Sequence, residues 1–171
     1  MVNSIENPDR ANTAALQGIL QDQCDLLRAL EATLATETEI LSGATPGGPE
    51  RLMAIAAEKQ VHLGSLAASG MELDRVLRDT GCPADREGLE RYLASIDADA
   101  TAALSALRTE LKNHLENCRA VNQANGSLIE RRHESVQQAL WLLNGEDSAT
   151  GTYAPSGRVG PAPRSHTLAK A

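Results

Sequence analysis

Few side chains in this sequence are spaced for chemistry. His114 and Cys118 are four residues apart, so they share one face of a helix and could in principle hold a metal ion together. A metal centre needs further ligands, and the neighbouring sequence supplies no clear third or fourth one. We therefore expect no bound metal and interpret both side chains as half-buried packing residues.

Glu37 and Lys59 are charged residues at positions of apolar heptad repeats. A turn at Pro46 that pairs Leu41 with Leu52 would bring the two charges within about one helical turn of each other. A catalytic carboxylate–lysine pair would need a pocket and further polar groups, which the sequence does not indicate. We interpret the two residues as an ion pair that sets the register of two helices.

The cysteines Cys24, Cys82 and Cys118 are odd in number and widely spaced, which is typical of free thiols in a reducing cytoplasm. The sequence has no CxxC pair, phosphate loop, nucleophile elbow or recognisable pair of catalytic acids. We expect a protein that is not an enzyme and that carries no cofactor.

Composition narrows the class of protein further. The net charge is −7, with acidic and basic residues interleaved, which argues against non-specific binding to nucleic acid or to anionic membranes. Residues 1–10 lack the apolar core of a signal peptide, and no run of about 18 apolar residues predicts a transmembrane helix. The chain has no Phe and one Trp, so leucine and alanine must form the core, as suits close helix packing.

The elements that must position these residues are predicted to be helices. The first begins at Asn7-Pro8 and stops at the glycines and prolines of residues 43–49. Its seam has the 4-3 spacing of a coiled coil and consists of Leu16, Leu20, Gln23, Leu27, Leu30, Leu34, Glu37 and Leu41. The second helix has a similar seam, consisting of Leu52, Ala56, Lys59, Leu63, Leu66, Gly70, Leu73 and Leu77.

Residues 81–83 end the second helix, and Asp85 can cap a third, which extends over residues 86–144 with a weak stretch at 97–101. The expected fold is all-α: an elongated antiparallel coiled coil or helical bundle of three long helices. It forms one helical domain, residues 1–144, followed by a flexible, glycine- and proline-rich tail, residues 145–171.

Asn122, Asn125 and Gly126 are unexpected inside this third helix. Glycine costs about 1 kcal/mol relative to alanine in a helix interior, and asparagine competes for its own backbone. We interpret this block as a polar joint that separates a long helix from a shorter one.

The shorter helix, about residues 127–144, has an apolar stripe formed by Ile129, Val136, Leu140 and Leu143. Leu128 and Ala139 widen this stripe, whereas Trp141 and Leu142 fall outside it. Leaving the four stripe residues in water forfeits about 1.5–3 kcal/mol each, so either the first two helices or a partner must cover them.

The block from Cys118 to Ile129, with Asn122, Asn125 and Gly126 inside it, resembles the FlgN-type flagellar export chaperones. Other segments match that family's layout, and they are Leu34, residues 37–41, Lys59, residues 139–143 and residues 153–157. The resemblance covers roughly residues 16–157 and gives no role to residues 158–171.

This resemblance implies a cytoplasmic chaperone of flagellar type III protein export. Its clients would be the hook-associated (hook–filament junction) proteins, whose C-terminal amphipathic helices the family binds through its own C-terminal part. The client-binding residues would then be Leu128, Ile129, Val136, Leu140, Trp141 and Leu143. Tyr153 resembles the residue with which the family docks onto the cytoplasmic domain of the export gate.

A different class of protein also fits the pattern. A structural or adaptor coiled-coil protein would self-associate through its seams, and the last stripe would then be ordinary core. A homo-oligomer is compatible with both interpretations.

Overall fold

The computed structural model describes residues 8–143. The fold of these residues is all-α, as the sequence predicted. The chain divides into two compact units, residues 1–129 and 130–171. The described helices are α1 (Pro8–Ser42), α2 (Pro49–Asp79), α3 (Arg86–Ser95) and α4 (Ala98–Leu143). None of them is both long enough and apolar enough to cross a lipid bilayer.

Helix α1 carries the core of the first unit. It begins at Pro8 and ends at Ser42, as predicted, where Gly43 takes a positive φ of 82° that favours glycine. All eight residues of the predicted first seam are buried, including the two polar members Gln23 and Glu37. The 4-3 spacing therefore identified the inward face of this helix correctly.

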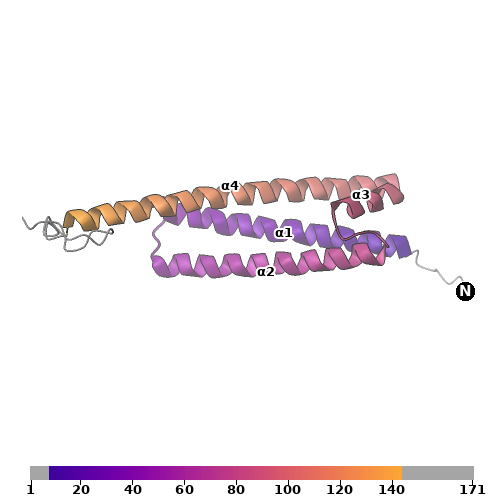
Figure 1. Ribbon diagram of the computed structural model, residues 1–171, viewed down its shortest axis with the longest axis horizontal. Coiled ribbons are helices and arrows are strands. Elements are labelled where there is room, and N and C mark those ends of the chain that lie inside the picture. Colours follow the sequence, from indigo (N-terminus) through magenta and orange to yellow (C-terminus); the bar gives the residue numbers. More distant parts are fainter. Residues whose placement is uncertain (1–7, 144–171) are drawn as a thin grey trace, which may run out of the picture. The chain divides into compact units, whose positions relative to one another are not determined.

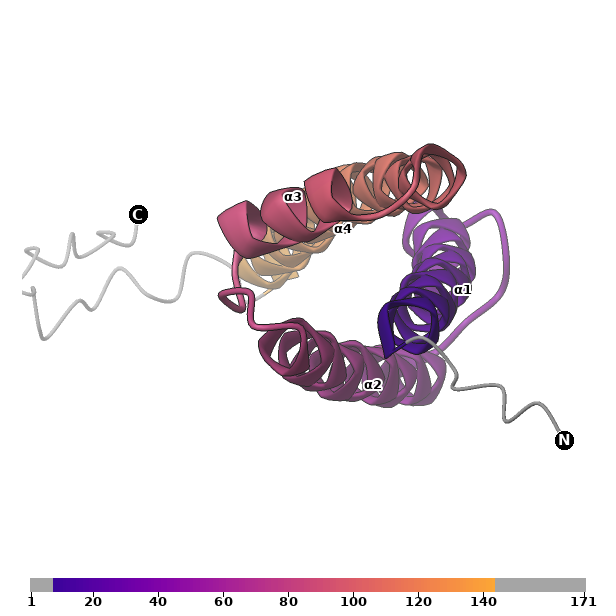
Figure 2. The same cartoon turned by 90° about the vertical axis from the view of Figure 1, so that its right-hand side faces the viewer.

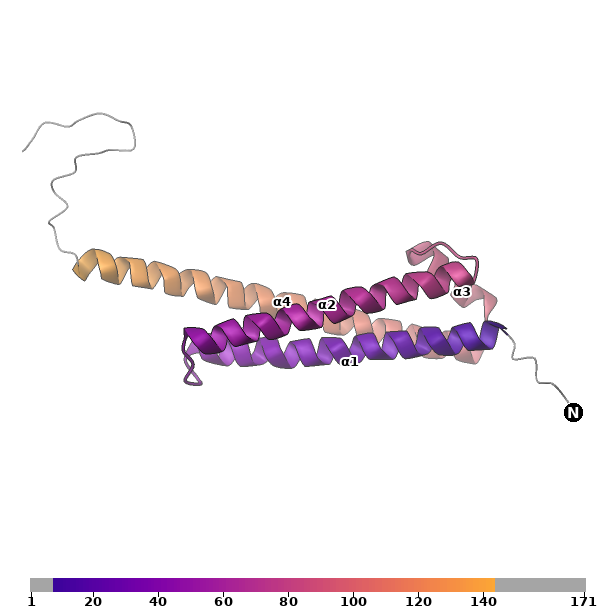
Figure 3. The same ribbon diagram turned by 90° about the horizontal axis from the view of Figure 1, so that it is seen from below.

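Helix α2 returns antiparallel to α1, and the two lie side by side (Figures 1 and 3). The prediction for its seam was partly wrong, because Ala56 and Leu63 are exposed whereas Ile55 and Val76 are buried. The helix is rotated so that these β-branched residues face α1. Leu63 instead lines a shallow groove of about 270 Å³.

The turn after α2 depends on two glycines. Gly81 has a φ of 76°, and its backbone lets the chain reverse after Thr80. Asp85 caps α3, as predicted, by accepting a hydrogen bond from the backbone N–H of Gly88 at 2.7 Å. A Cβ atom on Gly88 would lie 1.8 Å from the Pro83 carbonyl oxygen, so no other residue fits there.

The predicted third helix is in fact two helices, α3 and α4. Ile96 adopts an extended conformation with ψ 171°, and the Asp97 side chain accepts a hydrogen bond from the backbone N–H of Ala100 at 2.9 Å. The hydroxyl of Thr101 also lies 2.9 Å from the Leu93 carbonyl oxygen and ties the two helices together. The stretch that looked weak in the sequence is therefore a capped corner.

Apolar side chains of the first unit pack in two clusters, and the view along the helices shows α1, α2 and the α3–α4 corner around a common centre (Figure 2). The larger cluster takes residues from all four helices and includes Leu16, Leu77, Tyr92 and Leu104. The smaller one joins Leu27, Leu30 and Leu34 of α1 to Cys118 of α4.

Candidate functional site

Asn125 is the most buried polar side chain that the structure describes, with 1% of its surface exposed. Its amide nitrogen donates to the Leu34 carbonyl oxygen at 3.0 Å and to Oε2 of Glu37 at 2.9 Å. Its amide oxygen accepts a hydrogen bond from the Thr38 hydroxyl at 2.7 Å. Both N–H groups and the oxygen are thus in use, which a buried amide requires.

The ion pair predicted between Glu37 and Lys59 is confirmed. Nζ of Lys59 lies 3.0 Å from each carboxylate oxygen of Glu37, so the charge of the buried carboxylate is balanced. Because Asn125 donates to the same carboxylate, α1, α2 and α4 meet at one polar cluster. We call Glu37, Thr38, Lys59 and Asn125 the buried polar cluster.

The prediction that residues 122–129 separate two helices is wrong, because α4 continues through the whole block. Asn125 points into the buried polar cluster, whereas Asn122 is exposed and its Oδ1 lies 3.5 Å from Nζ of Lys59. A Cβ atom on Gly126 would meet nothing within 4 Å. The polar residue in the apolar repeat therefore marks a specific contact rather than a joint.

Sequence reasoning missed Thr38. It lies within residues 37–41, a segment that matches the family's layout, but one residue beyond the seam position of Glu37, so the heptad spacing alone assigned it no contact. An asparagine at an apolar seam position does imply a buried partner on the facing helix, and the Glu37–Lys59 pair pointed to the right level of the bundle.

The last part of α4 exposes apolar side chains. Every residue from 130 to 143 is exposed, and Val136, Leu140, Trp141 and Leu143 have between 51% and 81% of their surface in contact with solvent. Among the other predicted client-binding residues, Ile129 is 50% exposed and Leu128 is half-buried.

The described residues therefore leave the side chains of the stripe exposed to solvent, as a binding surface requires. The predicted gate-docking residue, Tyr153, lies outside the described residues.

His114 and Cys118 are engaged by α1. Nδ1 of His114 lies 3.0 Å from Oε1 of Glu31, and the Cys118 thiol points to the Leu27 carbonyl oxygen at 3.7 Å. Burial raises the pKa of the Cys118 thiol. Burial alone would raise the pKa of Glu31 as well, but hydrogen bonds from Asn117 and His114 outweigh it and hold that pKa below its ordinary value.

Within residues 8–143, no group of three or more His, Cys, Asp or Glu side chains is placed to hold a metal ion. The three cysteines are free thiols; Cys24 and Cys118 are buried and Cys82 is half-buried.

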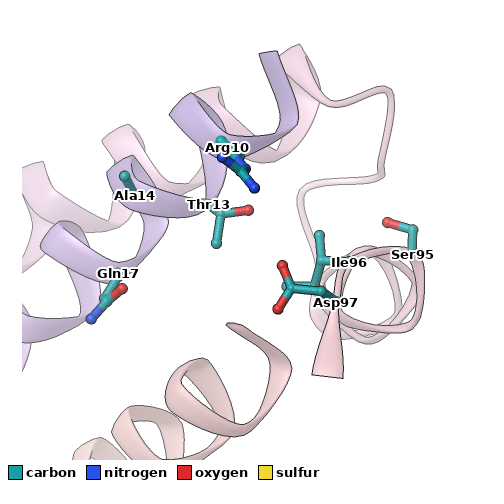
Figure 4. Close-up of a pocket in the computed structure, with 7 residues that line it drawn as sticks. All are labelled: Arg10, Thr13, Ala14, Gln17, Ser95, Ile96 and Asp97. Carbon is teal, nitrogen blue, oxygen red and sulfur yellow. The ribbon is translucent and has the colours of Figure 1, made fainter. Parts of the chain in front are cut away.

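A hollow of about 420 Å³ lies where the start of α1 faces the corner between α3 and α4 (Figure 4). Its lining consists of Arg10, Thr13, Ala14, Gln17, Ser95, Ile96 and Asp97. The Asp97 carboxylate already caps α4, and the lining does not pair a nucleophile with a base.

In residues 8–143 the fold is all-α, with a buried polar cluster between α1, α2 and α4 and an exposed apolar stripe at the end of α4. Residues 12–160 match the family model described as FlgN protein. The chain belongs to the FlgN family, the FlgN-type flagellar chaperones. Neither the curated proteins nor the solved structures give a match to this chain.

Proposed function

We propose that this protein is a cytoplasmic binding protein without catalytic activity, which shields hook-associated (hook–filament junction) proteins before their export. In this proposal it covers the C-terminal amphipathic helices of these clients and delivers them to the flagellar type III export gate. Membership of the FlgN family supports the general role, and the exposed end of α4 supports the mode of binding.

The observation that carries the proposal is the exposure of Val136, Leu140 and Leu143 on one stripe of α4. Burying such side chains contributes about 1.5–3 kcal/mol each, so a client helix laid along the stripe would gain several kcal/mol. Trp141 is 74% exposed beside the stripe and offers the large aromatic surface that is enriched at binding hot spots.

Stability and client binding would be carried by separate residues. Both apolar clusters and the buried polar cluster consist of residues between 16 and 125, whereas the exposed side chains of residues 130–143 take no part in them. A client could therefore occupy the stripe without displacing any of these core contacts.

The test is a titration of the full chain with the C-terminal segment of a junction protein, followed by calorimetry. We expect a one-to-one complex, and we expect it to be lost when residues 127–171 are removed. Circular dichroism of the shortened chain checks that α1 to α3 still form. If the shortened chain binds the segment with unchanged affinity, the client site is not on the last part of α4.

Tyr153 is proposed to dock onto the export gate, on the basis of the family resemblance. Replacement by alanine is expected to leave client affinity unchanged and to weaken binding to the cytoplasmic domain of the gate protein. Loss of client binding in this variant would contradict the proposed division between the two sites.

A further inference from the structure

Besides the stripe at the end of α4, helix α2 also has an exposed apolar face. Met53, Val61 and Met71 are each between 66% and 71% exposed, although they are among the larger apolar residues of the helix. Smaller exposed residues fill the positions between them, and they are Ala57, Gly64 and Ala68. Successive members of this set of six are three or four residues apart, which places them on one side of the helix. We call these six residues the outer face of α2.

The outer face is not needed for the described fold. The buried residues of α2 are Ile55, Val76 and Leu77, which pack towards the other helices of the first unit. At 100° per residue, Ile55 and Leu77 lie on the opposite side of the helix from the outer face, and Val76 lies about 100° from its centre. It contains no charged side chain, and large apolar surfaces left uncovered in this way mark contacts with another protein.

We propose that a second copy of this chain covers the outer face, with the two α2 helices antiparallel. In the register that we propose, the numbers of two facing residues add up to 125. Val61 of one copy therefore lies over Gly64 of the other. Ala57 then faces Ala68, and Met71 faces Ala54. A large side chain meets a small one at Val61–Gly64 and Met71–Ala54, two alanines meet at Ala57–Ala68, and Met53 meets Glu72, so small residues near the centre of the contact allow the two helices to approach.

The charges at the two ends of the face support the same arrangement. Glu50 and Arg75 lie on this side of α2, just beyond Met53 and Met71. In the antiparallel pair, Glu50 of each copy faces Arg75 of the other, so two ion pairs close the contact. A parallel pair would instead place Glu50 beside Glu50 and Gly64 beside Gly64, with like charges together and a gap at the centre.

The contact would be two-fold symmetric, since the same face is used by both copies. From Glu50 to Arg75 it would extend about 38 Å along the helix. It involves α2 alone, so the inference does not depend on the proposed client site at the end of α4.

Sedimentation equilibrium of the full chain over a range of concentrations tests the pairing. We expect a two-chain species for the natural sequence and a single chain for Val61→Arg, which places a charge at the centre of the contact. Ala106→Arg adds the same charge to an exposed position of α4 and is expected to leave the dimer intact. Circular dichroism checks that both variants remain helical.

Two results would overturn the proposal. One is a natural chain that sediments as a single chain at every concentration. The other is a dimer that survives Val61→Arg. If that dimer is instead lost in Leu140→Asp, the contact lies at the end of α4.

The charges test the antiparallel direction. Glu50→Arg or Arg75→Glu alone is expected to weaken the dimer several-fold, because each sets like charges opposite each other. The double variant reverses both charges and is expected to recover the affinity of the natural chain. A double variant weaker than either single variant would exclude this register.

Discussion

The amide nitrogen of Asn125 lies 2.9 Å from a carboxylate oxygen of Glu37, although 88 positions separate the two residues in the chain. This contact joins α4 to α1 inside the bundle, and Lys59 brings α2 to the same carboxylate. It shows why an asparagine interrupts an otherwise apolar repeat. Substitutions at this contact should therefore affect the stability of the fold, whereas substitutions in the exposed stripe should affect binding.

Replacing Asn125 by alanine should destabilise the fold. The variant removes the amide that donates to Glu37 and to the Leu34 carbonyl oxygen and that accepts from the Thr38 hydroxyl, so each of these groups loses one hydrogen bond. Losing these hydrogen bonds inside the bundle is expected to cost about 1–3 kcal/mol of unfolding free energy, measured by urea denaturation. Asn122→Ala is the matched control at an exposed position, and a loss as large there would contradict the assignment.

Replacing Lys59 by alanine should lower the melting temperature while client affinity stays the same. The variant leaves the buried Glu37 carboxylate without its cation, which costs about 1–3 kcal/mol at a site where Lys59 is still partly exposed. Thermal denaturation and calorimetry with a client segment measure the two effects. Glu37→Met combined with Lys59→Met should recover part of the lost stability, since no unpaired charge remains. An unchanged melting curve for Lys59→Ala would argue against the ion pair's contribution.

Glu31 should make stability depend on pH in the acid range. Its pKa in the folded protein lies below the ordinary value of 4.5, so the unfolded chain binds this proton more tightly. The contribution is present above pH 4.5 and is lost as the pH falls through the lower folded pKa. We therefore expect the difference in unfolding free energy between the natural chain and Glu31→Gln to shrink as the pH falls below 4.5.

A second variant tests the cause of the low Glu31 pKa. Asn117→Ala removes one of the hydrogen bonds that lower it, and should shift the loss of stability to higher pH. Urea denaturation at a series of pH values measures both effects, and identical profiles for the natural chain and Glu31→Gln would contradict them.

Leu140→Asp should abolish client binding at little cost in stability. Leu140 is half exposed, so a carboxylate there stays hydrated in the free chain but would be buried against an apolar client helix. We expect at least a tenfold loss of affinity by calorimetry, or about 1.4 kcal/mol, with a melting temperature near that of the natural chain. Gln138→Asp introduces the same charge on the same helix away from the stripe, and a loss of affinity as large in this control would show that charge alone is responsible.

Much of the fold followed from residue spacing. The 4-3 repeat of α1 identified its buried face, and the positions of Pro8, Gly43 and Asp85 identified where helices begin and end. These signals are local, since they depend on backbone conformation and on the period of one helix. The same kind of signal was less successful for α2, whose many alanines and glycines do not distinguish one side of the helix from another.

The sequence by itself determined that the chain is helical, where α1 and α2 end, and that an apolar stripe lies near the end of α4. Only the tertiary structure decided that Asn125 completes a buried cluster, that Ile55 replaces Leu63 in the core, and that the outer face of α2 is uncovered. The reason is physical: a helix period specifies which residues share a side, whereas the rotation of each helix against its neighbours depends on packing across long separations in the chain.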